Sequence, residues 1–156
     1  MKIEIGQTAP DFTLFDSEKN QVTLSEQRGK NLVLLFFPLA FTSVCTAELC
    51  SVRDNIDWYN KVNATVFGIS VDSLQTLAKF KTEQRLNFTL LSDFNKEVSK
   101  SYDALYEKFA YNMNGVSKRA AFVIDREGIV KYAEVLENAG EQPNFEAIQQ
   151  TLAEIA

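Results

Sequence analysis

Cys45 is the residue of this sequence whose type and position best suit it to act as a nucleophile. It follows the short apolar run 31–35, which is typical of a buried strand, and beyond it the apolar residues recur at helical spacing. We therefore expect Cys45 in the first turn of a helix that begins near Thr42 or Ser43. Unpaired backbone N–H groups and the positive end of the helix dipole favour a thiolate there. The sequence contains no histidine, which excludes Cys–His and Ser–His–Asp catalysis and His-containing zinc sites.

Three further side chains are candidates to serve this thiolate. Thr42 precedes Cys45 by three residues, and its hydroxyl can cap the helix, donate to a bound oxygen, or do both. Glu48, one turn later, would oppose thiolate formation unless a cation neutralised it. Arg119 opens an otherwise apolar predicted strand and is the candidate cation, with Lys118 as the alternative. An arginine there could pair with Glu48 and lower the pKa of Cys45 from about 8.5, although each charge alone is also compatible with a solvated surface residue.

Pro38 and Cys50 each allow two interpretations. Pro38 ends the apolar strand, and it either only terminates that strand or also shields the thiolate from water. Cys50 is either a small buried hydrophobe or the disulfide partner of Cys45. In an ideal helix, residues five positions apart have Cα atoms roughly 8.7 Å apart, whereas a disulfide needs about 4.4 to 6.8 Å. Pairing would therefore require the first helical turns to unwind, and residues 43–51 contain no glycine or proline as a hinge.

Composition limits the classes of protein to be considered. The 156 residues, 46% of them hydrophobic, can bury a substantial core, so we expect one domain over residues 1–156. The net charge of −5 provides no basic surface for nucleic acid or for an anionic membrane. The first residues lack the pattern of a signal peptide, and no apolar run reaches the length of a membrane span. We expect a cytoplasmic protein, in which two cysteines favour redox chemistry or burial over a structural cross-link.

Hydrophobic periodicity and turn residues predict the elements that position these side chains. In chain order we expect a hairpin over 5–14 and 21–24, a helical turn over 25–30, a strand over 31–37, a helix from 42 or 43 to about 59 or 62, a strand over 65–72, a helix over 74–84 capped by Ser73, a strand over 88–93, a short helix over 95–102, an irregular or partly helical segment over 103–117, a hairpin over 119–135 and a helix after Pro143. This order predicts an α/β, thioredoxin-like fold with an N-terminal β-hairpin extension and a central mixed sheet flanked by helices.

The motif Pro38-x-x-x-Thr42-x-x-Cys45, followed by Glu48 and by Arg119 at the head of an Ala-Ala-Phe-Val-Ile-Asp strand, resembles the peroxiredoxins. The segments 6–12 and 122–128 resemble the same family, so the resemblance covers nearly the whole chain. It implies that Cys45 is the peroxidatic cysteine and that Thr42 and Arg119 bind and polarise the peroxide. It also implies that Pro38 shields the pocket and that Glu48 orients Arg119.

The subfamily signals differ. Cys50, five residues after Cys45, is similar to the bacterioferritin-comigratory (Q-type) pattern, whereas residues 37–42 resemble the E-type, one-cysteine group. No cysteine follows Cys50 in this sequence, so we expect no resolving cysteine near the carboxyl end.

The resemblance implies a thiol-dependent peroxidase that needs no metal or organic cofactor. It would reduce hydrogen peroxide and organic hydroperoxides to water or alcohol through a Cys45 sulfenic acid, which Cys50 resolves as an intramolecular disulfide. The implied partners are the peroxide and thioredoxin or a similar thiol reductant, with the enzyme a monomer or a homodimer. Three alternatives remain open: a one-cysteine peroxidase reduced by an external thiol, a thiol–disulfide oxidoreductase acting on proteins, and a non-enzymatic redox-sensing module.

Overall fold

The computed structural model describes residues 2–156, except for the side chain of Cys45. In chain order its strands (β), α-helices (α) and 3-10 helices (η) are β1 Thr13–Asp16, β2 Gln21–Thr23, η1 Leu24–Gln27, β3 Asn31–Phe36, α1 Ser43–Asp54, α2 Ile56–Lys61, β4 Ala64–Ser70, α3 Leu74–Gln84, β5 Thr89–Ser92, α4 Glu97–Ser101, η2 Ala110–Asn112, β6 Arg119–Ile124, β7 Val130–Leu136 and α5 Phe145–Ile155. Within residues 2–156, no helix combines the length and the apolar composition that crossing a membrane requires.

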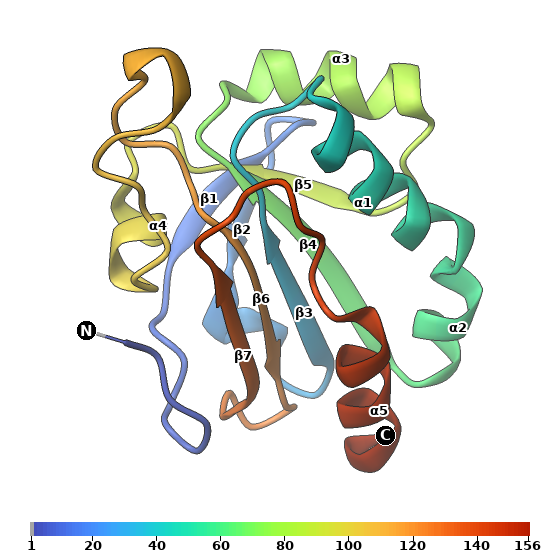
Figure 1. The fold of residues 1–156 in the computed structure, drawn as a ribbon. Coiled ribbons are helices and arrows are strands. Elements are labelled where there is room, and N and C mark those ends of the chain that lie inside the picture. Colours follow the sequence, from blue (N-terminus) through green and yellow to red (C-terminus); the bar gives the residue numbers. More distant parts are fainter. Residues whose placement is uncertain (1) are drawn as a thin grey trace.

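The strands form one seven-stranded sheet in the order β2-β1-β5-β4-β3-β6-β7 (Figure 1). Strands β3, β4 and β5 run parallel to one another. Strand β6 lies antiparallel beside β3, and β7 and β1 add further antiparallel pairs. The two parallel strands β3 and β4 require a crossover, which α1 and α2 supply. The predicted mixed, thioredoxin-like sheet is therefore confirmed, with β3 near its centre.

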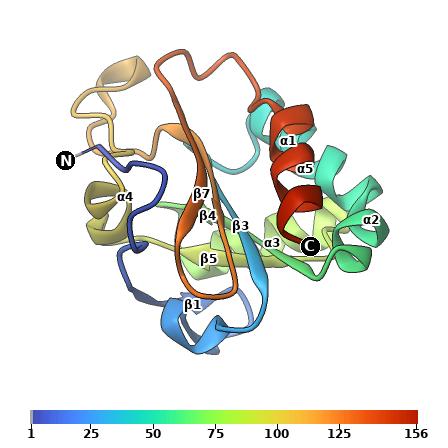
Figure 2. The same cartoon turned by 90° about the horizontal axis from the view of Figure 1, so that it is seen from below.

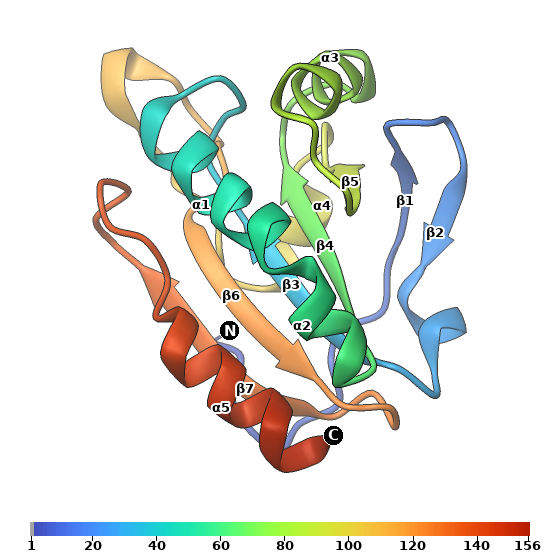
Figure 3. The ribbon, with the colours of Figure 1, turned by 90° about the vertical axis from the view of Figure 1, so that its right-hand side faces the viewer.

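Both faces of the sheet are covered, which explains why β3 is a continuous apolar run and not an alternating one. Val33 and Leu35 belong to one core cluster, shared with side chains of α1, α2, α3 and α5. Leu34 and Phe36 belong to the opposite cluster, shared with α4 and the N-terminal segment. Figure 2 shows α4 on one side of the sheet and α2, α3 and α5 on the other, and Figure 3 shows α1, α2 and α5 in front of the strands.

The carboxyl end of α5 is fastened to the amino end of β3. The carbonyl oxygen of Ile155 accepts hydrogen bonds from Asn31 Nδ2 at 3.3 Å and from Arg126 Nη2 at 3.0 Å. Asn31 is the first residue of β3, so α5 ends at the opposite end of that strand from the start of α1. Figure 1 shows the two ends at the bottom and the top of the molecule.

Several element boundaries differ from the prediction. The helix predicted from residue 42 or 43 to about 59 or 62 is divided at Asn55, whose side chain donates to the Ser51 carbonyl at 2.8 Å. The N-terminal hairpin is shorter than expected, since β1 begins only at Thr13 and Thr8 forms an isolated bridge with Ile129. By contrast, α3 has the predicted bounds, and its cap is confirmed because Ser73 Oγ accepts from the Thr76 N–H at 3.1 Å.

Candidate active site

The loop between β3 and α1 delivers the first turn of α1 to the carboxyl end of β3. Within it Phe41 has a φ of +67°, a left-handed conformation that is costly for a residue with a side chain. Two contacts hold the loop in this shape. The Phe41 ring packs edge-on against Phe80 of α3, with the ring centroids 5.1 Å apart. The buried Ala40 donates its N–H to Asp72 Oδ2 at 2.8 Å, and no motif in the sequence marks Asp72 as part of this site.

Thr42 occupies the N-cap position of α1, but its side chain makes no capping hydrogen bond. Its hydroxyl donates instead to the Leu39 carbonyl at 2.9 Å. The expected side-chain cap is therefore wrong, because the adjacent loop carbonyl takes the hydroxyl hydrogen. In this arrangement the Thr42 oxygen keeps its lone pairs, so it can accept a hydrogen bond from a ligand hydroxyl where donation to a bound oxygen was expected.

Cys45 is the third residue of α1, and its backbone lies in the first turn as predicted. Its side chain lies outside the described residues. The amino end of α1 supplies unpaired N–H groups and the positive end of the helix dipole near this position. This environment favours an anion at the first turn.

Arg119 and Glu48 form a buried ion pair beside this turn, which confirms the predicted pairing. Arg119 is 2% exposed and Glu48 is fully buried, and Arg119 Nη1 lies 2.6 Å from Glu48 Oε1. The other edge of the guanidinium is held by the Ala139 carbonyl, which accepts from Nε at 3.1 Å and from Nη2 at 2.8 Å. The guanidinium is therefore fixed from two sides, which suits its planar fork of donors.

The second oxygen of Glu48, Oε2, is buried without a hydrogen-bond partner among the residues that the structure describes. Burial raises the pKa of Glu48 to about 7, the nearby charge of Glu134 adds to this, and Arg119 acts in the opposite direction. The direction follows from complete burial of a carboxylate with only one oxygen satisfied. A proton taken up by Glu48 therefore removes the negative charge that this carboxylate contributes to its ion pair with Arg119.

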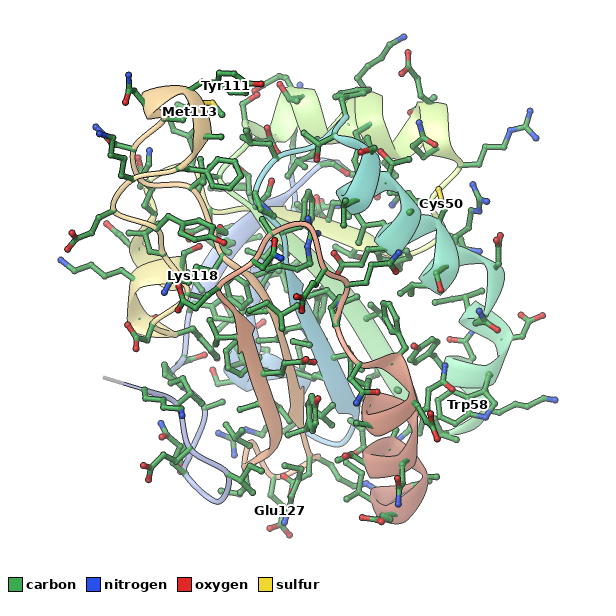
Figure 4. All side chains as sticks on the ribbon, viewed as in Figure 1. Cys50, Trp58, Tyr111, Met113, Lys118 and Glu127 are labelled. Carbon is green, nitrogen blue, oxygen red and sulfur yellow. The ribbon has the colours of Figure 1, made fainter. Side chains whose placement is uncertain are left out.

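Lys118, the alternative cation, does not face Glu48. Its ammonium pairs with Glu137 at 2.8 Å and lies 5.7 Å from the centroid of the Tyr106 ring. Figure 4 shows Lys118 on the side of the molecule toward α4, away from α1. Arg119 is therefore the cation that the fold brings to this carboxylate.

A depression with a volume of about 230 Å³ opens at this place. Its walls are largely apolar, and the lining residues with polar side chains are Thr42, Ser43 and Arg119. It is lined by Pro38, Thr42, Ser43, Val44, Phe109, Arg119, Ala139 and Gly140. The β3–α1 loop, strand β6, the segment 103–117 and the β7–α5 loop therefore meet at one site. Pro38 lies in its wall.

Cys50 lies half-buried on α1, and its thiol is free. Its Sγ donates to Gln84 Oε1 at 3.7 Å, and Arg53 Nη1 donates to the Gln84 carbonyl at 2.6 Å. Figure 4 shows Cys50 on α1 beside the segment that follows α3. Because α1 is continuous from Ser43 to Asp54, the backbones of Cys45 and Cys50 are held at helical separation. A bond between these cysteines therefore requires α1 to unwind.

Comparisons with known proteins agree on one family. The AhpC/TSA family matches residues 5–133. Alkyl hydroperoxide reductase E from Mycobacterium tuberculosis is 40% identical over 136 residues, which cover 85% of this chain and 86% of that protein. A putative peroxiredoxin, bcp, from Coxiella burnetii is 39% identical over 132 residues, covering 83% and 87%. The crystal structure of peroxidoxin BcpB from Mycobacterium tuberculosis matches with a TM-score of 0.86 at 29% identity and covers 99% of both chains.

Proposed function

Because the chain belongs to the AhpC/TSA family and is a thiol-dependent peroxidase of the peroxiredoxin type, we propose that Cys45 is its peroxidatic residue. The observation that carries this proposal is the buried Arg119, fixed by Glu48 and Ala139 beside the first turn of α1. A cation held there favours the Cys45 thiolate over the thiol. The substrates we propose are hydrogen peroxide and organic hydroperoxides.

The proposed reaction begins with attack of the Cys45 thiolate on one peroxide oxygen. The new S–O bond forms as the O–O bond breaks, and the other oxygen leaves with the bonding pair and takes up a proton as water or alcohol. Cys45 is oxidised to a sulfenic acid and the peroxide is reduced. Arg119 stabilises the thiolate and then the negative charge that develops on the leaving oxygen. Thr42 orients the substrate by accepting the peroxide O–H, since its own hydrogen points to Leu39.

Pro38 and Glu48 have supporting roles in this proposal. Pro38, in the wall of the depression, shields the thiolate from bulk water. Glu48 keeps the fork of Arg119 in the plane that serves the reacting oxygens.

For the second half of the cycle we propose that Cys50 resolves the sulfenic acid. Its thiol condenses with the Cys45 sulfenic acid, water leaves and an intramolecular disulfide forms, which thioredoxin or a similar dithiol then reduces. The step requires α1 to unwind and Cys50 to leave Gln84. The uninterrupted helix favours the second candidate, a one-cysteine cycle in which an external thiol reduces Cys45.

Stopped-flow measurement of peroxide consumption tests the central assignment. Cys45→Ser should abolish consumption with the far-UV circular dichroism spectrum unchanged. Cys50→Ser is the matched control, because it removes the other thiol of the same helix and should leave the first oxidation intact. Turnover of Cys45→Ser near the wild-type rate would place the nucleophile elsewhere.

A further inference from the structure

The loop between β7 and α5 contains a turn that is closed by the side chain of Asn138. The Asn138 carbonyl accepts from the Glu141 N–H at 3.1 Å, and Asn138 Oδ1 accepts from the Gly140 N–H at 2.9 Å. An Asn that bonds the backbone two residues ahead forms an Asx-turn, a local arrangement that fixes the direction of the chain. A Cβ atom at Gly140 would lie 3.1 Å from Asn138 Oδ1, so the amide lies directly over this glycine.

The turn leaves one carbonyl available, and that carbonyl holds Arg119. Because Asn138 supplies both acceptors of the turn, the carbonyl of Ala139 is not used within it. It accepts instead from Arg119 Nε at 3.1 Å and Nη2 at 2.8 Å. The orientation of the peptide after Ala139 therefore sets where one edge of the guanidinium lies.

Both ends of this loop are anchored, which makes Asn138 the side chain that shapes its middle. At the start, the Glu137 carbonyl accepts from the Tyr106 hydroxyl at 2.7 Å. At the end, the Asn144 N–H donates to Glu134 Oε1 at 2.9 Å, and Asn144 caps α5. Asn138 itself is exposed, so its replacement leaves the core untouched. The loop also follows residue 133, the last residue matched by the family.

We propose that Asn138 is a positioning residue for the peroxidase reaction, acting through the Ala139 carbonyl on the orientation of Arg119. The inference rests on the role proposed above for Arg119. With the turn closed, Glu48 and Ala139 together fix the plane and direction of the guanidinium. With the turn open, the Ala139 carbonyl is no longer held toward Arg119, so the Nε and Nη2 edge of the guanidinium loses the acceptor that fixes its direction.

The test compares Asn138→Ala with Asn138→Asp, whose carboxylate keeps an acceptor for the Gly140 N–H. Glu141→Ala is the matched control, since it removes the 3.4 Å contact of Asn138 Nδ2 and leaves the turn acceptor in place. All are measured in a Cys50→Ser background by the second-order rate constant for hydrogen peroxide and by the pH profile of Cys45 alkylation. We expect Asn138→Ala to lower the rate constant about fivefold, as for the loss of one hydrogen bond, and to move the alkylation profile to higher pH. Asn138→Asp and Glu141→Ala should stay near the parent rate.

A wild-type rate constant and alkylation profile for Asn138→Ala would overturn the inference. So would an Asn138→Asp variant as slow as Asn138→Ala, because the turn acceptor would then be irrelevant. Each rate is measured well below the unfolding midpoint of its own variant, so a loss of global stability alone does not change it. Residual turnover of Cys45→Ser would refute the proposed function itself, which keeps the two failures distinct.

Discussion

Glu48→Gln is expected to remove a specific pH dependence from the stability of the protein. Burial raises the pKa of Glu48 to about 7 from its ordinary value of 4.5, against the opposing effect of Arg119. The native state therefore keeps a proton on Glu48 over a pH range in which the unfolded chain has lost it. The stability that this proton contributes is fully present below about pH 4.5 and is lost as the pH rises through about 7.

The magnitude follows from those two values. We consider a carboxyl group with a native pKa near 7 and an unfolded pKa near 4.5. As the pH rises from about 5.5 to about 8.5, its contribution to the free energy of unfolding falls by about 2 kcal/mol. Urea unfolding of wild type and Glu48→Gln across this range measures it. The difference in unfolding free energy, wild type minus variant, should fall by about 2 kcal/mol as the pH rises. The chain has no histidine, so no imidazole titrates in the same window.

Glu134→Gln is the matched control for this measurement. The charge of Glu134 contributes to the raised pKa of Glu48, and a glutamine oxygen can still accept from the Tyr132 hydroxyl and the Asn144 N–H. The midpoint of the wild-type pH dependence should therefore move to lower pH in this variant. If the difference in unfolding free energy, wild type minus Glu48→Gln, rises with pH, the prediction is wrong, because the ion pair with Arg119 then outweighs the effect of burial.

Two further predictions concern the reaction. Arg119→Lys should lower the second-order rate constant for peroxide by roughly tenfold or more, because an ammonium cannot bind both Glu48 and Ala139 as the planar guanidinium does. Stopped flow measures this rate constant, and a value equal to that of wild type would show that a positive charge alone suffices. After one equivalent of peroxide, intact mass of the wild type should fall by about two units with a loss of far-UV helicity, whereas Cys50→Ser should gain about sixteen. A wild type that also gains sixteen, with Cys50→Ser turning over normally, would make Cys50 only a packed thiol.

The parts of the fold predicted from sequence are those with a strong local signal. The apolar run of β3 and the capped amphipathic pattern of α3 both depend on nearby residues alone. The pairing of Glu48 with Arg119 was predictable because a carboxylate beside a thiolate needs a cation. An arginine is an unusual residue at the start of an otherwise apolar strand, which makes Arg119 stand out as that cation. The break at Asn55 was missed, since asparagine also occurs inside helices and only its bond to Ser51 distinguishes this one.

The missed parts of the site depend on contacts between distant segments. The acceptor at Ala139 is a backbone carbonyl, a group that every residue carries, so nothing in the residue type marks it. Phe109 lines the depression from a segment without periodicity. Asp72 reaches Ala40 only because β4 and β3 end side by side in the sheet. A short polar residue after a strand carries no sign of that neighbour.

The anchoring of α5 determines how a fusion to this protein would behave. The Ile155 carbonyl is tied to Asn31 at the amino end of β3, while the depression lies beyond the carboxyl end of the same strand. Six strand residues span roughly 20 Å. A reductant domain joined at Ala156 therefore needs a linker with at least that reach to meet the site. If the protein is attached to a solid surface through Ala156, its depression faces the solution and stays open to peroxide.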